Sequence, residues 1–428
     1  MIDVLLVVDN YRRDYFGMRL VYLKLKAEGL AVKICGKYSV VEAVNYYKPI
    51  STVVTAIDFD WIGEISTVCY IIYLPSESVA GNVDYIKMYH GGFYPNCKVY
   101  SDKVDMIFCW GSNYKLGVDE FFEESKVKVT GNPMTDYYYL HRAENESPSI
   151  GLGSSFRLLN PVAFCNQIES IDTVNRLNGE NIYFFSPYKV ENWYAIEVAG
   201  IRVFMEIVRM ISERYNVNFR PHPSENSRNY KYMETFNQNV HVGNEEPIYQ
   251  WLKQNDVIIS LFSTIFLDAY AMKKKSITIR NLLPKAIYDA VPGPLKEVDK
   301  MAFAPNTYDE LFEAIQDSKF DNDVQLDEKL KISCNYDQQS KPAYIKVSEE
   351  IKRFLRRNSR KKFAKLKSGS KVKHYKLKDI YIDIASYIQK TSNPQLSYLQ
   401  HRLFRNKQND RSIDSVYRQL ENKYGGSC

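Results

Sequence analysis

Short apolar runs alternate with longer amphipathic stretches along the first 320 residues of this chain. The runs at 4–8 and 257–259 are continuously apolar, which is typical of strands buried on both faces of a parallel sheet. Residues 193–214 instead repeat apolar side chains at the 3.6-residue period of a helix. Strand, helix and strand in succession predict a doubly wound α/β fold. Further strands are expected at 32–35, 52–56, 68–74, 106–110, 127–129, near 150, at 183–185, at 217–219 and at 276–279.

A polar run at 141–148 divides this pattern into two halves. It follows a predicted strand and a Thr-Gly-Asn-Pro element at 130–133, and it has the composition of a linker. A chain of 428 residues is also too long for one typical core. We therefore expect a domain at 1–142, a second at 149–325, and a basic tail at 335–428.

Composition narrows the class of protein only a little. The formal net charge of +6 is mild. The seven cysteines lack CxxC or Cys/His spacing, so no zinc motif is expected and free thiols in a reducing compartment fit best. There is no signal-peptide pattern, and no uncharged apolar run reaches the roughly 20 residues that span a bilayer. A cytoplasmic or peripherally membrane-bound protein is expected.

Two elements of the second half carry the clearest chemistry. The strand at 217–219 leads into Arg220-Pro-His222-Pro, where the prolines stiffen the loop and so favour binding of an anion. The strand at 256–260 leads to Ser263 and Thr264, which can cap the next helix and hold an anion at its start. Asp268, one turn further on, can accept a hydrogen bond from a ribose hydroxyl. Taken singly, the first element can be a plain rigid turn and the second a plain cap.

Together and in this order, the His-Pro and Ser-Thr elements resemble the pair shared by bacterial glycosyltransferases that use CMP-activated sugars. These are the Kdo transferases, the polysialyltransferases and the surface carbohydrate biosynthesis proteins. The resemblance covers about residues 1–320 and implies the GT-B fold, two Rossmann-like domains facing a cleft. It also implies that His222, Ser263 and Thr264 contact the nucleotide phosphate, with Arg220 beside them. CDP-glycerol transferases of teichoic acid synthesis carry a similar pair.

In the first, acceptor-binding half, the same resemblance singles out a glutamate. Glu77 follows the strand at 68–74 within Pro-Ser-Glu-Ser, where surface carbohydrate proteins often have Pro-Ser/Thr-Glu-Gly. It is the candidate acid–base residue for the acceptor hydroxyl, although Ser78 stands where the family has glycine. The charged loop after the first strand offers acceptor-binding side chains from Arg12, Arg13 and Asp14. A solvated loop is the plainer interpretation of these three.

Three weaker candidates lie at the start of the donor-binding half. Ser154 and Ser155 follow the glycine-containing strand near 150 and are expected to bind the nucleotide. Glu191 opens the helix at 193–214, where the helix dipole alone favours a carboxylate; the alternative is a catalytic carboxylate near the donor.

Asp58-x-Asp60 is a weak metal motif, and GT-B enzymes generally need no metal, so neither a metal nor another cofactor is expected.

The tail begins with a cationic segment that contains no acid between 351 and 378. Apolar residues are interleaved at roughly helical spacing, so the segment is expected to lie on an anionic membrane surface, near a lipid-linked acceptor. Nucleic acid is not an expected partner, since no nucleic-acid-binding motif is found. The interleaved apolar residues are Ile351, Phe354, Leu355, Phe363 and Leu366.

The sequence therefore predicts a glycosyltransferase that makes a bacterial surface polysaccharide, such as capsule or lipopolysaccharide O-antigen. Its donor would be a CMP-linked, Kdo-like or sialic-acid-like sugar, and its acceptor a glycan or lipid-linked glycan. One alternative is polyol-phosphate transfer from a CDP-polyol, which needs a second histidine in the first half; His90 is the candidate. Another is a non-catalytic scaffold of polysaccharide assembly at the membrane. Retention or inversion, the sugar and the oligomeric state stay open.

Overall fold

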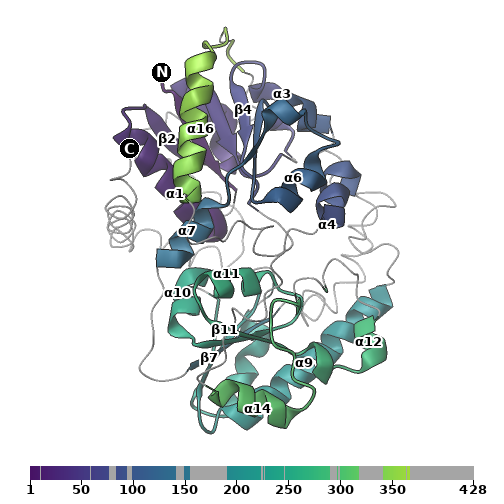
Figure 1. The fold of residues 1–428 in the computed structure, drawn as a ribbon. Helices are drawn as coiled ribbons and strands as arrows, with labels where there is room; N and C mark the ends of the chain where they lie inside the picture. The colour runs from purple at the N-terminus through teal and green to yellow at the C-terminus, as the bar shows by residue number, and fades with distance from the viewer. Residues whose placement is uncertain are drawn as a thin grey trace. The chain divides into compact units, whose positions relative to one another are not determined.

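The computed structural model divides the chain into two compact units (Figure 1). Unit 1 comprises Met1–Leu140 and Ile332–Cys428, and unit 2 comprises His141–Lys331. The residues that the structure describes are 1–9, 11–57, 59–76, 83–93, 99–140, 149–154, 190–222, 225, 227–244, 246–289, 296, 299–317, 341–362 and 364–366.

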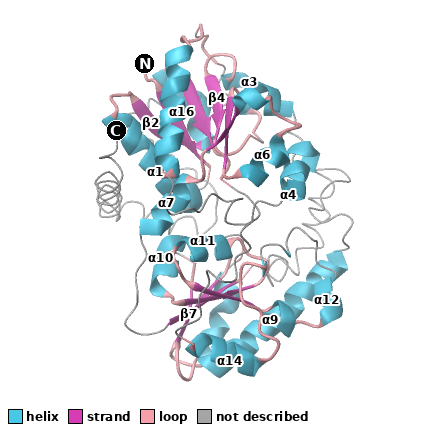
Figure 2. Cartoon of the chain, viewed as in Figure 1, coloured by secondary structure: helices cyan, strands magenta, loops and turns pink. Residues whose placement is uncertain are grey.

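Unit 1 is built on a six-stranded parallel sheet in the order β2-β1-β3-β4-β5-β6. Helices flank this sheet, as they do the sheet of unit 2 (Figure 2). The strands are β1 (Val4–Val8), β2 (Val32–Gly36), β3 (Ser51–Val54), β4 (Tyr70–Tyr73), β5 (Met106–Cys109) and β6 (Val127–Val129). The helices are α1 (Tyr11–Ala27), η1 (Lys37–Ser39), α2 (Val40–Tyr47), α3 (Trp61–Ile65), α4 (Val83–Met88), η2 (Tyr89–Phe93), η3 (Ser101–Lys103), α6 (Ser112–Val118), η4 (Glu124–Lys126), α7 (Pro133–Leu140) and α16 (Ala343–Arg357).

The described residues of unit 2 form a five-stranded parallel sheet in the order β11-β10-β7-β8-β9. Its strands are β7 (Ser149–Gly153), β8 (Asn216–Arg220), β9 (Val240–Val242), β10 (Val257–Ser260) and β11 (Lys275–Thr278). Its helices are α9 (Val190–Ile211), η6 (Ser227–Thr235), α10 (Ile248–Gln254), α11 (Ile265–Ala271), η7 (Arg280–Leu282), α12 (Lys285–Asp289) and α14 (Tyr308–Gln316).

The predicted doubly wound α/β fold is confirmed in both units, with local differences. Buried strands such as β1 and β10 have every side chain covered, as their continuous apolar runs require. Strand β9 was not predicted, because three residues with an exposed histidine at the centre give no apolar run. The predicted strand at 183–185, the expected linker at 141–148 and Asp58 lie outside the described residues.

The start of α1 corrects one expectation. The sequence predicted a loop at 9–14, whereas the helix begins at Tyr11 and carries Arg12, Arg13 and Asp14 on its first turn. An acidic residue in the first turn is favoured by the positive end of the helix dipole, which helps the helix to begin this early. Further along α1, a Cβ on Gly17 would lie 2.7 Å from the backbone nitrogen of Met134, so only glycine allows α1 and α7 to approach this closely.

The cationic C-terminal segment, residues 341–362 and 364–366, packs on unit 1. Its helix α16 runs alongside α1 (Figure 1) and buries one apolar face there, with Tyr344 and Ile351 both fully covered. Beyond Arg357 the helix stops, which differs from the expected helical spacing through 366. Phe354 instead meets Tyr70 edge to face at 5.3 Å. Leu366 and Asn45 exchange two hydrogen bonds at 2.9 and 3.1 Å.

Two cations of this segment bind carbonyl oxygens at the amino ends of the strands. Arg360 donates to the carbonyls of Ile2 and Lys48, and Lys361 donates to those of Ser66 and Cys69. These carbonyls lie within the four residues that lead into β1, β3 or β4, at the amino ends of the strands. The segment therefore covers the amino ends of the strands. Parallel α/β sheets bind ligands at the opposite ends, the carboxyl ends of the strands.

A buried carboxyl joins α7 to the start of α16. Asp136 accepts a hydrogen bond from the backbone N–H of Tyr344 at 2.7 Å, although the two residues are 208 positions apart. Burial raises the pKa of Asp136 to about 7, against the opposing hydrogen bonds from the N–H groups of Tyr344 and Ala343. The carboxyl thus caps a helix from a different part of the chain.

This raised pKa makes the stability of the protein depend on pH. The folded state binds a proton at Asp136 that the unfolded chain releases near pH 4, so this stabilisation is complete below about pH 4 and is lost as the pH rises through about 7. Asp136→Asn keeps an oxygen acceptor but cannot ionise. We expect its melting temperature, relative to that of the wild type, to rise from pH 5 to about pH 7 and to level off above that in calorimetry. A constant difference across this range would contradict the assignment.

Candidate functional site

The first candidate site lies in unit 2, where the carboxyl ends of β10, β7 and β8 adjoin. Among the described strands of the unit, the central strand β7 comes first in the chain, and its neighbours β8 and β10 come second and fourth. The direction of winding therefore reverses between β7 and β10. Ligands in open α/β sheets bind beyond the carboxyl ends of the strands at such a reversal. Ser154 follows β7, His222 follows β8, and Ser263 follows β10.

Glu225 connects the exits of β7 and β8. The residue is 1% exposed, and its carboxylate accepts hydrogen bonds from the hydroxyls of Ser154 at 2.8 Å and Tyr230 at 2.7 Å. Its own N–H donates to the carbonyl of His222 at 2.8 Å. Burial raises the pKa of Tyr230, and the neighbouring Glu225 adds to this rise, so the phenol keeps its proton and remains a donor. Glu225 thereby fixes the positions of Ser154 and the His222 loop relative to each other.

The loop after β8 is fixed through its backbone and leaves the imidazole in a half-buried position. The side-chain amide of Asn244 donates to the carbonyls of Pro221 and His222 at 3.3 and 3.4 Å. Arg220 is buried, donates to the carbonyl of Glu246 at 2.7 Å, and lies 5.9 Å from the Trp251 ring. These contacts of Arg220 support the loop itself.

The exit of β10 is a tight turn into α11. The hydroxyl of Ser263 accepts from the N–H of Ile265 at 3.3 Å, while Thr264 makes no side-chain cap bond and is exposed. Of the predicted pair, Ser263 is thus the residue whose hydroxyl caps the helix. Asp268 is half-buried one turn further on. The hydroxyl of Ser260 donates to the carbonyl of Gly153 at 2.6 Å and joins the ends of β10 and β7.

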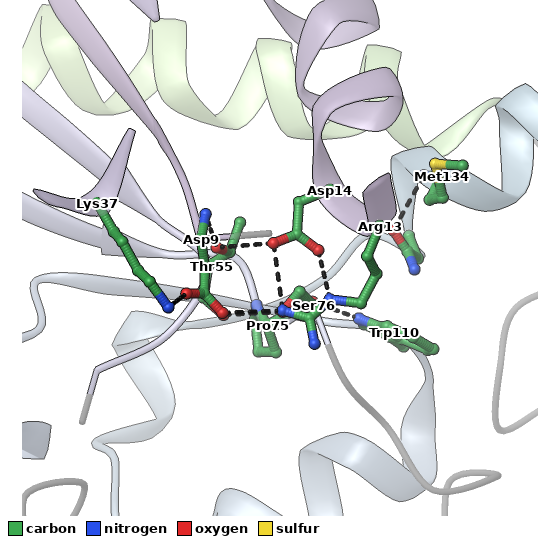
Figure 3. Close-up of polar contacts among 10 residues, drawn as sticks. Asp9, Arg13, Asp14, Lys37, Thr55, Pro75, Ser76, Trp110 and Met134 are labelled. Atoms are coloured by element: carbon green, nitrogen blue, oxygen red, sulfur yellow. Dashed lines mark hydrogen bonds and ion pairs between the residues drawn. The ribbon is translucent and has the colours of Figure 1, made fainter. Parts of the chain in front are cut away.

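The second candidate site is a charged cluster at the carboxyl ends of β1, β2 and β3 in unit 1 (Figure 3). Arg13 donates from Nε to Asp14 at 2.6 Å and from Nη2 to Asp9 at 3.0 Å. Lys37 forms an ion pair with the other oxygen of Asp9. Burial lowers the pKa of Lys37, but the hydrogen bond and charge of Asp9 outweigh it and raise that pKa. Thr55 donates to Asp14 at 3.4 Å.

Within this cluster the roles of the predicted residues differ. Asp14 is only 5% exposed and holds the guanidinium of Arg13 in place, whereas the side chain of Arg13 is 30% exposed. Asp9, Lys37 and Thr55 were not singled out from the sequence. Each is the first residue after an observed strand, β1, β2 or β3, although Thr55 fell inside the strand predicted at 52–56.

The chain that leads to Glu77 is anchored beside the same cluster. Both the N–H and the hydroxyl of Ser76 bond the carbonyl of Thr55 at 3.3 Å, and the indole N–H of Trp110 donates to the carbonyl of Pro75 at 2.7 Å (Figure 3). Glu77 itself and Ser155 lie outside the described residues. Arg12 and Glu191 lie on α1 and α9, and their side chains are likewise outside the description.

His90, the histidine that a polyol-phosphate transferase would need, is a core residue. It is fully buried, and its ring meets those of Tyr73 and Phe122 edge to face at 6.0 and 5.6 Å. Its Nε2 lies 3.4 Å from the hydroxyl of Tyr114. Burial lowers the pKa of His90 to about 3, so the ring is neutral at physiological pH.

In the described part of the chain, no three His, Cys, Asp or Glu side chains lie together as a metal site would require. Within the same residues, no helix combines the length and apolarity that crossing a bilayer demands.

Comparison with known proteins shows the fold. No protein-family model matches the sequence, and no curated protein sequence matches it either. Among solved structures, the S. aureus MnaA-UDP co-structure matches with a TM-score of 0.50 and 12% identity, over 85% of this chain and 100% of that one. The wall teichoic acid polymerase TagF matches with a TM-score of 0.51 and 11% identity, over 83% of this chain and 90% of that one. The likeness is to GT-B proteins with two Rossmann-like domains.

Proposed function

We propose that this chain is a glycosyltransferase of bacterial surface polysaccharide synthesis and that its donor is a CMP-activated sugar of the Kdo or sialic-acid kind. The observation that carries the proposal is the junction of β10, β7 and β8, whose exits bear Ser263, Ser154 and His222 at the switch point of a Rossmann-type sheet. The GT-B likeness supports a nucleotide-linked donor, since one similar structure holds UDP. The choice of CMP rests on the His-Pro and Ser-Thr elements.

In this proposal the phosphate of CMP is held without a metal. His222, Ser263 and Thr264 donate to the phosphate and stabilise the negative charge that grows on it as the sugar leaves, which is the kind of preorganised electrostatics that dominates catalysis. Ser154 and Ser155 complete the nucleotide site, and Asp268 accepts from the ribose. Arg220 contributes by stabilising the loop that carries His222, as its hydrogen bond to the carbonyl of Glu246 indicates.

The acceptor is proposed to bind in unit 1. Glu77 removes the proton from the acceptor hydroxyl, and Glu191 is the second proposed carboxylate, on the donor side. The cluster of Asp9, Arg13 and Lys37 supplies carboxylate acceptors and cationic donors, which suit the hydroxyls and acidic groups of a glycan. Asp14 keeps Arg13 oriented for this role.

A second candidate function is polyol-phosphate transfer from a CDP-polyol, for which the structural likeness to TagF is the specific support. The burial and neutrality of His90 speak against it, because the second histidine is then sealed inside an aromatic cluster. A non-catalytic scaffold is the third candidate, and it predicts nucleotide binding without turnover.

We propose a cytoplasmic protein whose membrane contact, where a lipid-linked acceptor is used, is electrostatic. Ile351 and Leu366, which the sequence pattern assigned to a lipid-facing side, pack on unit 1 instead. Exposed cations remain on the same segment and each contributes about 1 kcal/mol at an anionic surface. Binding to phosphatidylglycerol vesicles should therefore disappear in high salt. The exposed cations are Arg353, Arg356, Arg357, Lys362 and Lys365.

A thermal-shift screen with CMP, CDP, UDP, GDP and ADP tests the donor class. A ligand that binds only the folded state stabilises it, by about 2.7 kcal/mol at a hundredfold excess over its Kd. We expect the largest shift with CMP, followed by turnover of CMP-Kdo or a CMP-sialic acid. A shift with UDP alone would keep the fold and exclude the CMP-linked donor, whereas no shift with any nucleotide would favour the scaffold.

A further inference from the structure

Phe262, the second residue after β10, has a backbone conformation that aromatic residues rarely adopt. Its φ is +50°, in the left-handed region. Lys48 and Lys273 also have positive φ, but both follow the last turn of a helix, where a left-handed residue commonly ends the helix. Phe262 precedes a helix, so helix termination does not account for it. Strain of this kind persists only where the surrounding structure imposes it.

A buried carboxyl binds the backbone of Phe262. Oδ1 of Asp299 accepts the backbone N–H of Phe262 at 2.9 Å, across 37 residues of sequence, and Asp299 is fully buried. The ring of Phe262 stacks on that of Tyr288, with centroids 5.5 Å apart and planes inclined by 18°. The ammonium group of Lys296 also contacts the Tyr288 ring, 5.2 Å from its centroid. The turn is therefore held at its backbone and at its side chain.

The conformation of Phe262 decides where the next two residues lie. Ser263 follows it directly and caps α11 through its hydroxyl, and Thr264 is the exposed residue before the helix. A change from left-handed to extended backbone at Phe262 would rotate the peptide that leads to Ser263. The hydroxyls would then leave the end of β10.

We propose that Asp299 is a positioning residue for the nucleotide phosphate: by holding Phe262 in the left-handed conformation, it presents Ser263 and Thr264 to that phosphate. The inference rests on the proposed function, because it assigns these two hydroxyls to the phosphate of the donor. Asp299 acts through the turn and does not touch the ligand.

The ionisation of Asp299 makes its hydrogen bond with Phe262 depend on pH. Burial raises the pKa of this carboxyl to about 7, while the hydrogen bond from the N–H of Phe262, the charge of Arg280 and the hydroxyl of Thr278 oppose the rise. An ionised carboxylate is the stronger acceptor for an N–H donor. The hydrogen bond from Phe262 to Asp299 is thus stronger as the pH rises from 6 to 8.

The test measures the Kd of CMP by calorimetry for the wild type, Asp299→Asn and Asp299→Leu. Asparagine keeps the oxygen acceptor, so we expect a Kd within about threefold of the wild type at pH 6. Leucine has no acceptor and should weaken binding by about tenfold or more, the loss of roughly one charge-assisted hydrogen bond. The ratio of the asparagine Kd to the wild-type Kd should rise between pH 6 and pH 8, since only aspartate ionises.

Two substitutions at the turn itself keep the test decisive if Asp299→Leu does not fold. Glycine adopts positive φ freely, whereas valine strongly disfavours it. Phe262→Gly should bind CMP better than Phe262→Val, and Phe262→Gly should restore part of the affinity lost in Asp299→Leu. Equal affinity in all folded variants, with wild-type binding intact, would overturn the role of Asp299 alone. Absence of nucleotide binding in the wild type would overturn the proposed function and this inference together.

Discussion

His222→Ala is expected to lower the turnover of the CMP-sugar donor by about 100- to 1000-fold while the protein remains folded. Removing one preorganised donor from a site that stabilises developing negative charge has an effect of this size. His222 stands at the carboxyl end of β8, beside Ser154, in a loop whose carbonyls are already fixed by Asn244. The variant therefore loses the imidazole without disturbing the backbone that carried it.

The measurement is steady-state donor turnover, together with the melting temperature of each variant. His241→Ala is a matched control, because His241 is exposed at the centre of β9 in the same unit and lies away from the exits of β7, β8 and β10. We expect the control to retain wild-type turnover. Near-normal turnover in His222→Ala would remove this residue from the phosphate site.

Tyr344→Ala is expected to destabilise unit 1 by about 3–5 kcal/mol, in the range found when a large buried ring is truncated. Tyr344 is fully buried on α16, and α16 packs against both α1 and α7. The substitution leaves a cavity at this junction, while the backbone N–H that bonds Asp136 is retained. A loss of this size lowers the melting temperature by roughly 10 °C in a domain of this size.

Differential scanning calorimetry measures this effect, with Arg356→Ala as the control on the exposed face of the same helix. The control should change the melting temperature by no more than about 2 °C, as exposed substitutions away from special contacts usually do. Equal melting of Tyr344→Ala and the wild type would mean that α16 contributes little to unit 1 in solution.

The fold followed from local patterns. Continuous apolar runs such as those of β1 and β10 can be covered only inside a parallel sheet, and the periodic apolar face of α9 can be covered only against one. The strand-exit positions of Ser154, His222 and Ser263 were therefore predictable, because parallel strands bring their carboxyl ends to one edge. The short β9 and the early start of α1 were not, since neither changes the apolar pattern.

The C-terminal segment shows how a local pattern misleads. Apolar residues among cations predict an amphipathic membrane helix, and a single sequence does not say which surface covers them. In the structure Ile351 is buried on unit 1. Arg360 and Lys361 bind carbonyls at the amino ends of the strands of its sheet. The partner surface is formed by residues some 300 positions away, so only tertiary contacts decided between lipid and protein.

By itself the sequence determined the Rossmann-like fold of both halves and placed Ser154, His222 and Ser263 at strand exits, because apolar periodicity and chain order are local properties. Only the tertiary structure decided how these groups are held. Glu225 joins Ser154 to the His222 loop, Asp299 holds the turn at Phe262 from 37 residues away, and His90 lies inside an aromatic cluster. Burial and distant partners set the geometry and the pKa of each of these groups, and neither can be read from neighbouring residues in the chain.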